Sequence, residues 1–541
     1  MIATYTLNNL GLVAGTCNEL VIAKYVDTII PPDPQQKVTT GQAIVAMIIN
    51  GLGFSNRTLY LFPQFFEKKP VDILIGKELT AEDLNDDTIG RSLDRMSSYG
   101  CTELFSSVAF YATEKEQIDK KFGHLDSTTF SLYGDYKSSE EEGAAIHITY
   151  GASKQKRPDL KQIFLNLTVA SDGGIPLFMQ ALNGNSSDNT TFRKTVTEFR
   201  KGIRNNLQPI EYWIADSKFY TYDTISQVKY DTKWITRVPD NIKEAQIEIQ
   251  DAVMSIDQLQ PLSDDRYLYR THESCYGNVS QRWLVIFSYE ARKRSIETVR
   301  KAVEKEYLEI ERQSKKRGKK GFYCDPDAQK SIHFYQKKLK YHTISIESMD
   351  VIAKYKGRGR PSKNTEKQLL YCPRYHIVPN KEKIELEINK KAIFIIATNE
   401  LDNDKLTDME VFEHYKDQKK VEKGFRFLKD PLFFASSLFL KKPERIVALT
   451  MIMCLSLLIY SICERKLRML LKTMGTSIKS QVGKPTQRPT LRWVFQIFED
   501  VHLVRIGENR RWQIEVTNLR DDAKIVLNVL GPNYKEMYLL T

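Results

Sequence analysis

The chain has 541 residues, which at about 150 residues per domain is enough for several domains and a large buried core. Hydrophobic residues make up 41% and charged residues 27% of the chain, so the composition excludes a disordered protein and a small disulfide-stapled scaffold. The 80 lysines and arginines exceed the 68 aspartates and glutamates, and the net charge of +12 points towards a polyanionic partner.

The seven cysteines are odd in number and scattered, and none belongs to a Cys-X-X-Cys pair. Such a pattern encodes neither a zinc ribbon nor a disulfide framework, so we expect a reducing, cytoplasmic environment. The amino-terminal segment MIATYTLNNLGLVAG has neither the basic start nor the apolar run of a signal peptide.

One apolar segment is long enough to cross a membrane. Residues 446–463 contain no charged side chain over eighteen positions, which is the lower limit for a membrane-spanning helix. Thr450, Ser456, Tyr460 and Ser461 interrupt the run, and helices buried on all sides have the same composition. We therefore predict a buried helix and no membrane partner, with a membrane anchor as the alternative.

The first 115 residues predict a mostly helical region. In the segment DDTIGRSLDRM, Asp87 is a plausible N-cap, and Ile89, Leu93 and Met96 form one apolar stripe. This helix is either a small DNA reader or an ordinary amphipathic helix with solvated arginines, and the periodicity favours the second interpretation.

From Phe122 to about Pro239 the pattern changes to short strands alternating with single helices. The segments GHLDSTTFSLYG, AAIHITYG and IFLNLTVASDGGIPLFMQ predict strands, and SDGG is a hairpin signal. A helix is expected from about Asp188 or Asn189, followed by a strand that ends at Asp216, a short helix over TYDTISQV and a strand over KWITRVP. This order predicts an α/β fold with a mixed sheet covered on both faces.

Residues 240 to about 390 interrupt this pattern with a basic block. Between Arg292 and Lys363 there are 21 lysines and arginines and nine aspartates and glutamates, so this stretch carries an excess equal to the net charge of the whole protein. The block predicts a long charged helix and then a flexible segment, KYKGRGRPSK, in which Arg358 and Arg360 suit a minor groove or a phosphate backbone. A solvated basic linker is the equal alternative.

After the basic block, KAIFIIATNE predicts a strand, and LTDMEVFEHYKDQKKVEKGFRFLKDPLF predicts one helix that stops before Pro431. Tyr415, Gln418, Glu422 and Lys429 fall close to one stripe at 3.6 residues per turn. An ordered polar face with one carboxylate among basic residues needs an explanation. Further on, LVRIGENRRWQIEV predicts a hairpin.

Three carboxylates stand out by position: Asp126 in the first strand of the α/β region, Asp216 at the end of a later strand, and Glu422. Moving a phosphoryl group of DNA requires neutralising its charge and activating a water or a 3′-hydroxyl, which two Mg²⁺ ions about 4 Å apart can do. Because Mg²⁺ takes one or two carboxylates from a protein and keeps several waters, three converging acidic side chains would suffice. Spacing alone does not show that they converge.

Four segments carry a resemblance to a known family. HLDSTTFSLYG, YGASKQKRPDLKQ, WIADSKFY and the stretch from Tyr415 to Lys429 together resemble the DDE transposases of the IS4 superfamily, most closely its IS1634-type insertion-sequence branch. The family pattern in the last segment is Tyr, two residues, Arg, three residues, Glu, six residues, Lys. The chain matches this pattern except at Gln418, where arginine is usual. The N-terminal 110 residues also resemble the uncharacterised helical domain that precedes the catalytic core in this branch.

The resemblance implies a ribonuclease-H-like core with Asp126 on its first strand, Asp216 after the fourth strand and Glu422 on a following helix, the three holding Mg²⁺ with Mn²⁺ as a substitute. It implies metal-dependent cleavage at the ends of a mobile element and transfer of the 3′-hydroxyl ends to target DNA, without a covalent protein–DNA intermediate. Double-stranded DNA, as terminal inverted repeats and as target, is the expected partner. A homodimer in the DNA complex and association with the nucleoid are also expected.

The resemblance also implies where DNA is held. Tyr415 and Lys429 would hold the backbone near the scissile bond, and Lys419 or Arg426 could replace the contact put in doubt at Gln418.

Four further residues near the core have two interpretations each. Lys154 and Arg157 are candidates for phosphate contact, with ordinary surface charge as the alternative. His124 and His147 are more simply strand residues than metal ligands, because Mg²⁺ prefers oxygen.

A decayed or repurposed relative, which binds DNA through the basic insertion and catalyses nothing, is the competing hypothesis. The expected domains are a helical N-terminal domain that could bind DNA ends (1–115), the first part of the core (116–240), a basic insertion subdomain (241–390), the second part of the core with the catalytic helix (391–475) and a C-terminal subdomain (476–541).

Overall fold

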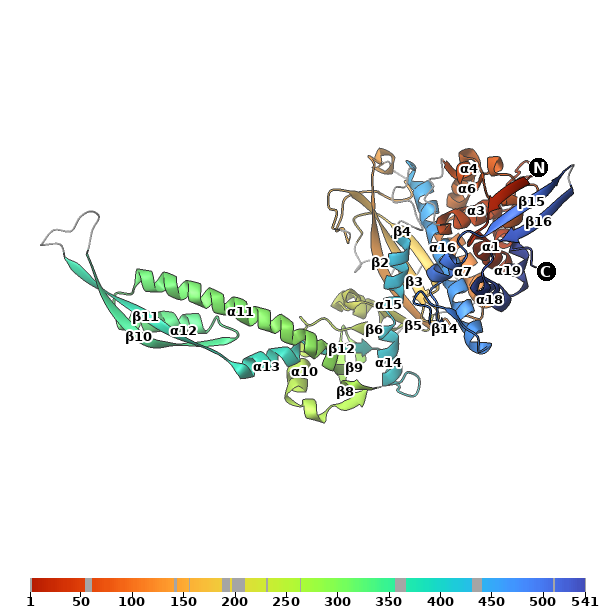
Figure 1. Ribbon diagram of the computed structural model, residues 1–541. Helices are drawn as coiled ribbons and strands as arrows, with labels where there is room; N and C mark the ends of the chain where they lie inside the picture. Colours follow the sequence, from red (N-terminus) through yellow and green to blue (C-terminus); the bar gives the residue numbers. More distant parts are fainter. Residues whose placement is uncertain are drawn as a thin grey trace. The chain divides into compact units, whose positions relative to one another are not determined.

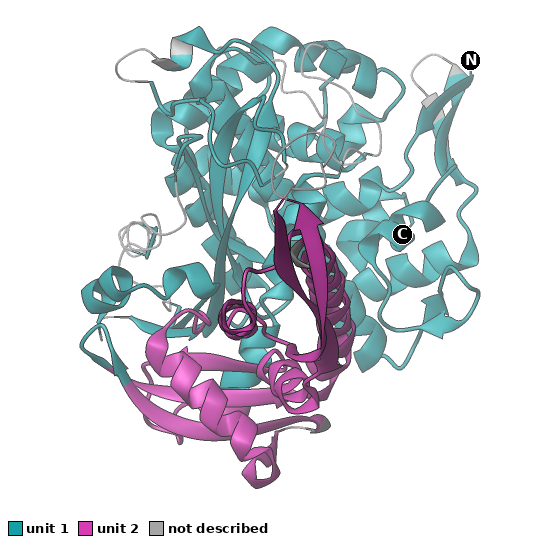
Figure 2. Cartoon of the chain, turned by 90° about the vertical axis from the view of Figure 1, so that its left-hand side faces the viewer, with its two compact units in different colours: residues 1–236, 275–279, 410–541 teal, residues 237–274, 280–409 magenta. Residues whose placement is uncertain are grey.

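The computed structural model divides into two compact units, each of which is described by itself (Figure 2). Unit 1 comprises residues 1–236, 275–279 and 410–541, and unit 2 comprises residues 237–274 and 280–409.

Some segments of the chain are outside the description. Most of the helix expected from Asp188 or Asn189 falls there, as do Arg358 and Arg360. The structure describes residues 2–53, 61–140, 144–154, 156–186, 195–196, 210–229, 232–262, 264–355, 366–430, 440–508 and 511–540.

A mixed sheet forms the centre of unit 1 (Figure 1). β2 pairs antiparallel with β3 and β3 antiparallel with β4, whereas β2 pairs parallel with β5 and β5 parallel with β6. This sequence of antiparallel and parallel pairs is the ribonuclease-H-like arrangement, and it confirms the predicted fold class. In spatial order the strands are β4 (Pro176–Leu182), β3 (Lys161–Ala170), β2 (Phe122–Leu132), β5 (Tyr212–Ala215) and β6 (Lys233–Arg237).

The strands of this sheet are covered on both faces. Every residue of β3 after Lys161 is buried, as expected for a largely apolar strand in the middle of a covered sheet. β3 and β4 are joined at the predicted SDGG hairpin, where Gly173 and Gly174 have φ of 75° and 66°, a region that favours glycine. The helices that pack on the sheet include α15 (Lys419–Leu428) on β2 and β3, and α7 (Cys101–Lys115) and α16 (Pro443–Thr473) on β4.

The strand expected over AAIHITYG does not form. Its residues make only an isolated bridge between Thr149 and Gln162. Ile146 and Ile148 are buried, so the apolar pattern is respected. Side chains satisfy the backbone instead of a neighbouring strand: Ile148 N donates to Ser139 Oγ at 3.2 Å, and this competition explains the wrong prediction.

The N-terminal part of unit 1 is helical, as predicted. α3 begins with a capping box, in which Thr39 accepts from Gln42 N and the Gln42 side chain accepts from Thr39 N. The helices here, besides α7, are α1 (Leu10–Glu19), α2 (Ile22–Ile29), α3 (Thr40–Leu52), α4 (Phe62–Phe66), α5 (Val71–Leu74) and α6 (Asp86–Tyr99).

The N-cap of α6 differs from the prediction. Asn85 Oδ1 accepts from Thr88 N at 2.9 Å, so Asn85 is the cap and Asp87 lies in the first turn. A carboxylate there still favours the helix N-terminus. The predicted apolar stripe is fully buried and consists of Ile89, Leu93 and Met96.

The two ends of the chain pack together in unit 1. The predicted C-terminal hairpin forms as β15 (His502–Glu508) and β16 (Arg511–Thr517), and β1 (Ile2–Thr6) adds to it as a third strand. Tyr538 Oη donates to the Asn8 carbonyl at 2.5 Å. The other C-terminal elements are β13 (Ile478–Lys479), β14 (Pro485–Thr486), α17 (Leu491–Ile497), α18 (Asp521–Leu530) and α19 (Pro532–Met537).

The apolar segment 446–463 lies within α16. The most apolar window of this helix has a mean hydropathy of 2.5, and 83% of it is buried inside the protein. This burial agrees with the predicted core helix. By length and composition alone, α16 would also pass as a membrane span.

The segment predicted as one helix forms two, α14 (Asp408–Lys416) and α15, so that prediction is wrong. At the junction Gln418 N bonds to the Tyr415 carbonyl at 3.1 Å and Lys420 N to the Asp417 carbonyl at 2.7 Å. These bonds reach back three residues instead of four, which interrupts the α-helical ladder. The predicted polar stripe is therefore divided between α14, the junction, α15 and its C-cap, in the order Tyr415, Gln418, Glu422 and Lys429.

Unit 2 contains an antiparallel arrangement of strands in the order β12-β9-β8-β7. The predicted strand KAIFIIATNE corresponds to β12. The strands are β7 (Gln260–Leu262), β8 (Asp264–Tyr276), whose tip belongs to unit 1, β9 (Val279–Ser288) and β12 (Ile393–Thr398), and the helices beside them are α10 (Lys243–Met254) and α13 (Lys381–Lys390).

The rest of unit 2 is an arm in which the predicted long charged helix, α11 (Tyr289–Lys320), runs beside a two-stranded ribbon (Figure 1). The ribbon consists of β10 (His342–Tyr355) and β11 (Lys367–Pro379), and α12 (Asp325–Gln336) packs against it. Residues 351–355 of β10 are exposed at every position. One apolar cluster within the arm consists of Ile310, Ile332, Leu339 and Ile344.

Candidate active site

Asp126 lies within β2, the middle strand of the unit 1 sheet. Its side chain is partly buried, and its Oδ1 accepts from Ser127 N at 2.7 Å. Because side chains alternate across a strand, Asp126 points to the same face as His124 and Thr128.

Asp216 directly follows β5, as predicted. Its Oδ1 accepts from Lys218 N at 3.0 Å and caps the short turn Ser217–Phe219. Its carbonyl oxygen accepts from Thr236 Oγ1 at 2.9 Å, which holds the end of β5 against β6.

The pairing of β2 with β5 relates the two aspartates. The strands are parallel, with His124 opposite Ile214. Two residues further along both strands, the same register places Asp216 opposite Asp126. Neighbouring strands lie about 4.8 Å apart. Opposed residues of parallel strands share a face, so both carboxylates belong to the same side of the sheet.

Glu422 lies in the first turn of α15 and is exposed. Two bonds fix this helix on β2: Gln418 Nε2 donates to the Leu125 carbonyl at 3.2 Å, and Lys429 Nζ donates to Thr128 Oγ1 at 2.6 Å. Gln418, Glu422 and Lys429 lie within roughly 40° of one another around the helix axis. Glu422 therefore belongs to the stripe that faces β2, between these two contacts.

The two bonds bracket Asp126 in the sequence of β2, and Thr128 contributes its side chain from the Asp126 face. In the described residues, however, no three His, Cys, Asp or Glu side chains lie close enough to hold one metal ion. The convergence of all three carboxylates therefore stays a prediction. Asp126 and Asp216 alone offer two hard oxygen donors on one face, which fits an ion such as Mg²⁺.

Two lysines lie near Asp126. Lys154 Nζ donates to the carbonyl and the Oγ of Ser127, at 2.6 and 2.8 Å. Burial and the ammonium group of Lys154 lower the pKa of Lys429, whereas the Asp126 carboxylate raises it. The two ammonium groups and the carboxylate thus act on one another, and β2 holds both lysines through hydroxyl groups.

A hydrogen-bonded network ties α14 and α15 to the sheet. His124 Nε2 lies 2.6 Å from Ser171 Oγ, which lies 3.2 Å from His414 Nδ1. His124 Nδ1 lies 3.3 Å from Gln418 Oε1, and the His414 ring stacks on Phe122 with centroids 3.5 Å apart. Burial lowers the pKa of His124 to about 4, so this imidazole is neutral at pH 7.

Gln418 uses both atoms of its side-chain amide inside the protein, one on Leu125 and one on His124. The position at which arginine is usual thus anchors the helix junction to β2 in this chain. The role of Gln418 as a DNA contact stays a prediction.

The other predicted DNA contacts lie on or near these elements. Tyr415 is partly buried on α14, and Lys419 and Arg426 are exposed on α15. Arg157 is exposed and forms an ion pair with Asp159 at 2.7 Å, which agrees with its interpretation as a surface charge.

Sequence reasoning missed the residues that join the helices to the β3–β4 turn. Ser171 was part of a hairpin signal, but its hydroxyl lies between two histidines, and Lys420 Nζ donates to its carbonyl at 2.6 Å. Nothing in the local spacing marks His414 as a partner of Ser171, because 243 positions separate them. His147 bonds to the Ser139 carbonyl at 2.6 Å, as expected for a structural residue.

Comparison with known proteins gave matches for most of the chain. Residues 118–459, more than half of its length, match the family described as transposase DDE domain. Residues 2–110 match a domain of unknown function, DUF4277, over the region predicted to be an uncharacterised helical domain. No curated protein matches the chain. Among solved structures, the chain is similar to a piggyBac transposase synaptic complex with hairpin DNA, with 9% identity, a TM-score of 0.36 and coverage of 92% of this chain and 82% of that chain.

Proposed function

The chain belongs to the transposase DDE domain family, and from this premise we propose that it cuts the ends of an insertion sequence and joins their 3′-hydroxyl groups to target DNA. DDE transposase domains use divalent metal ions; we propose Mg²⁺, with Mn²⁺ as a substitute. The motif spacing in the sequence supports membership of the IS4 superfamily and its IS1634-type branch.

One observation carries the proposed site. α15 is bonded to β2 on either side of Asp126 and carries Glu422 between the two bonds. The exposed Glu422 side chain thus extends from the stripe of α15 that is bonded to the strand of Asp126. In the proposal Asp126, Asp216 and Glu422 hold two Mg²⁺ ions, which would neutralise the phosphoryl group and activate the attacking hydroxyl.

The chain's own cations position the substrate. Lys154 and Lys429 neighbour Asp126 and are aligned by hydroxyl groups of β2, so they are suited to hold the two phosphates that flank the scissile one. Tyr415, Lys419 and Arg426 extend this contact along α14 and α15. We propose a homodimer in the DNA complex, since two ends must be brought together.

The test is a nicking assay on plasmid DNA that carries the sequences flanking the coding region. Asp126→Asn, Asp216→Asn and Glu422→Gln should each lower Mg²⁺-dependent nicking by about a thousandfold or more, because each removes a ligand needed at the transferred phosphoryl group. Duplex binding should remain, since no DNA contact is removed.

A matched control is Glu499→Gln, which makes the same chemical change at an exposed glutamate of unit 1. It should nick DNA like the unchanged protein. Near-normal nicking by any of the three site variants would refute the triad. Duplex binding by the unchanged protein without any nicking would favour the inactive DNA-binding relative.

A further inference from the structure

The far end of the ribbon in unit 2 is covered on one face. Gly321, directly after α11, lies so close to this face that a Cβ atom added to it would be 2.7 Å from Leu370 Cβ and 3.2 Å from Cys372 Sγ. The Phe322 backbone also bonds to the Tyr371 backbone in both directions, at 2.8 and 2.7 Å. The chain at the end of α11 therefore packs on the side of β11 that carries Leu370 and Cys372 (Figure 1).

The opposite face of the ribbon end is apolar and exposed. Directly opposed residues of an antiparallel pair share a face, and Ala353 pairs with Leu369 whereas Tyr355 pairs with Lys367. Val351, two positions before Ala353, belongs to the same face. The four apolar side chains of this face are all exposed, Leu369 to 53%. Because Ala353 carries only a methyl group, Leu369 projects beyond its neighbour across the ribbon.

Basic residues surround this apolar face. Lys367 Nζ lies 5.3 Å from the centre of the Tyr355 ring, and Lys354 is exposed on the neighbouring strand. The nearby Asp350 carboxylate accepts from Arg374 Nε at 2.8 Å, which offsets its charge. Over residues 350–370 the sequence contains six lysines or arginines and two acidic residues. The surroundings of the face therefore attract a polyanion.

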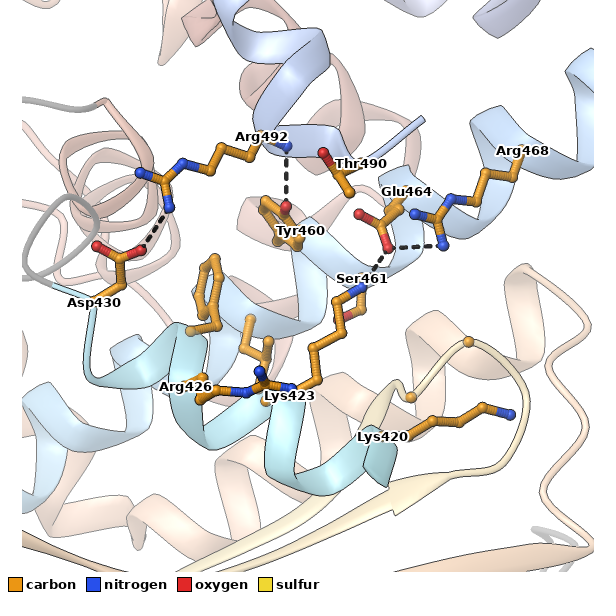
Figure 3. A pocket seen from close by; sticks show the side chains of 15 residues that line it. Lys420, Lys423, Arg426, Asp430, Tyr460, Ser461, Glu464, Arg468, Thr490 and Arg492 are labelled. Atoms are coloured by element: carbon orange, nitrogen blue, oxygen red, sulfur yellow. Dashed lines mark hydrogen bonds and ion pairs between the residues drawn. The ribbon is translucent and has the colours of Figure 1, made fainter. Parts of the chain in front are cut away.

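The cations beside α15 are used differently. In the pocket between α15, α16 and α17, Lys423 and Arg468 bond to the buried Glu464 carboxylate at 2.8 and 3.0 Å, and Arg492 bonds to Asp430 at 3.0 Å (Figure 3). These ion pairs join elements of unit 1 to one another. The ribbon end instead presents its lysines beside an exposed apolar face, which is the arrangement of a surface that meets a partner.

Duplex DNA fits this combination better than a second copy of the chain. A stable interface between two proteins uses about 20–30 residues a side, far more than this face offers, and the excess positive charge of the arm would repel a second arm. Strands can enter a DNA groove, and apolar side chains such as leucine can enter between base pairs from the minor groove and kink the duplex. Lysines beside such a side chain meet the phosphates.

We propose that the apolar face of the ribbon end docks in the minor groove of duplex DNA, where Leu369 enters between two base pairs and the arm bends the duplex. Lys354 and Lys367 hold the neighbouring phosphates. The sequence prediction for Arg358 and Arg360 invoked charge and a close backbone approach, whereas the exposed face adds an apolar wedge and a bend. The inference rests on the proposed function, because it takes double-stranded DNA as the partner.

The test measures energy transfer between fluorophores at the two ends of a duplex of about 30 base pairs whose centre consists of TA steps, because these steps kink easily. Mg²⁺ is left out, so that the DNA is bound without being cut. Binding of the full-length protein should shorten the end-to-end distance, as expected for a bend of roughly 20–90°. Netropsin, which occupies the minor groove of A·T-rich DNA, should abolish this rise in energy transfer.

Leu369→Ala removes the wedge and leaves every charge of the arm in place. Because the side chain is exposed, its truncation should leave folding intact. This variant should lose most of the rise in energy transfer, while its affinity for the duplex falls by less than about tenfold because the phosphate contacts remain. The matched control is Leu308→Ala, the same change at a 57% exposed leucine of α11, which should bend the duplex like the unchanged protein.

Four results would overturn the inference: no binding of the duplex, binding without a change in end-to-end distance, equal bending by Leu369→Ala and Leu308→Ala, and a bend that netropsin leaves unchanged. Light scattering without DNA tests the second copy as occupant, and a smaller particle for Leu369→Ala than for Leu308→Ala would also overturn the inference. The proposed function is read separately, from Mg²⁺-dependent nicking of plasmid DNA and its loss in Glu422→Gln, a variant in which the ribbon is unchanged.

Discussion

The sheet of unit 1 and the ribbon of unit 2 use antiparallel strands in opposite ways. β3 is buried along nearly its whole length, whereas β10 is exposed at every position from 351 to 355 and β11 alternates between exposed and partly buried residues opposite them. The sheet is pinned by helices on both sides. The ribbon packs against α11 and α12 through a small apolar cluster and through hydrogen bonds such as the one between His342 Nδ1 and Glu306 at 2.9 Å.

The difference in burial suits two different functions, namely the positioning of reactive groups and contact with DNA. The pairing of β2 with β5 holds Asp126 and Asp216 in a fixed relation, which the proposed phosphoryl transfer would require. The exposed end of the ribbon carries Lys354 and Lys367, and the contact with a DNA backbone that we propose for it would need no such precision. Local stability should therefore be high in the sheet and low at the end of the ribbon.

The largest expected effect is a matched pair of leucine truncations. Leu165→Ala in β3 removes a fully buried side chain and should lower the free energy of unfolding by about 2–5 kcal/mol. Leu369→Ala in β11 makes the same change at a side chain that is 53% exposed, and it should cost less than about 0.5 kcal/mol. Denaturant titration of both variants measures the two losses in free energy of unfolding. Equal losses would contradict the difference in burial between the sheet and the ribbon.

A second prediction concerns the bonds between α15 and the sheet. Gln418→Ala removes the amide that bonds the Leu125 carbonyl and His124 Nδ1, and it should cost about 1–3 kcal/mol of stability. Gln481→Ala removes an exposed amide that bonds to Gln496 at 3.4 Å, and this variant serves as the control. If the two variants melt alike, Gln418 does not anchor the helix.

A third prediction sharpens the role of the ribbon. Lys354→Gln with Lys367→Gln removes two exposed cations near its end. If they contact duplex phosphates, the slope of log affinity against log salt should become shallower by about 1.8. The double variant Lys472→Gln with Lys484→Gln, at exposed positions of unit 1, controls for net charge. If both double variants show the same slope, the ribbon does not contact DNA.

The smallest expected effect tests a surface pair in unit 1. Arg445 holds Asp94 through two bonds of 2.7 Å and lowers the pKa of that carboxyl. A lowered pKa in the folded state stabilises the protein above the unfolded pKa of about 3.9, and this stabilisation is lost as pH falls through the folded value. Arg445→Gln should therefore lower stability by at most about 1 kcal/mol at pH 7, since Asp94 is 43% exposed, and by less near pH 3. Melting curves of Arg445→Gln and of the control Arg520→Gln at both pH values measure this effect. An equal loss of stability at pH 7 and near pH 3 would contradict the prediction.

Much of the fold follows from local patterns. The largely apolar sequence of β3, the SDGG turn and the charged periodicity of α11 each identify their element because one local preference dominates. AAIHITYG misleads because its apolar alternation is that of a strand, while side chains of Ser139 and Asn183 take up its backbone N–H groups. β1 joins the C-terminal hairpin across almost the whole chain, a pairing without a local signal.

The sequence predicts on which element each carboxylate of the candidate site lies, but not the tertiary bonds that hold those elements together. The strand positions of Asp126 and Asp216 were correct, and the helical position of Glu422 was correct although the helix is broken before it. The break at Asp417 and Gln418 depends on bonds to Leu125, His124 and Ser171, which lie far away in sequence. Tertiary partners of this kind override helical periodicity, and only coordinates reveal them.

The most direct test of the account is iron-mediated cleavage of the polypeptide. Fe²⁺ added in place of Mg²⁺, with ascorbate and peroxide, should cut the backbone near Asp126, Asp216 and Glu422, and Asp126→Asn should abolish all three cuts together. Cuts beside the two aspartates with none in α15 would contradict the claim that Glu422 completes their metal site.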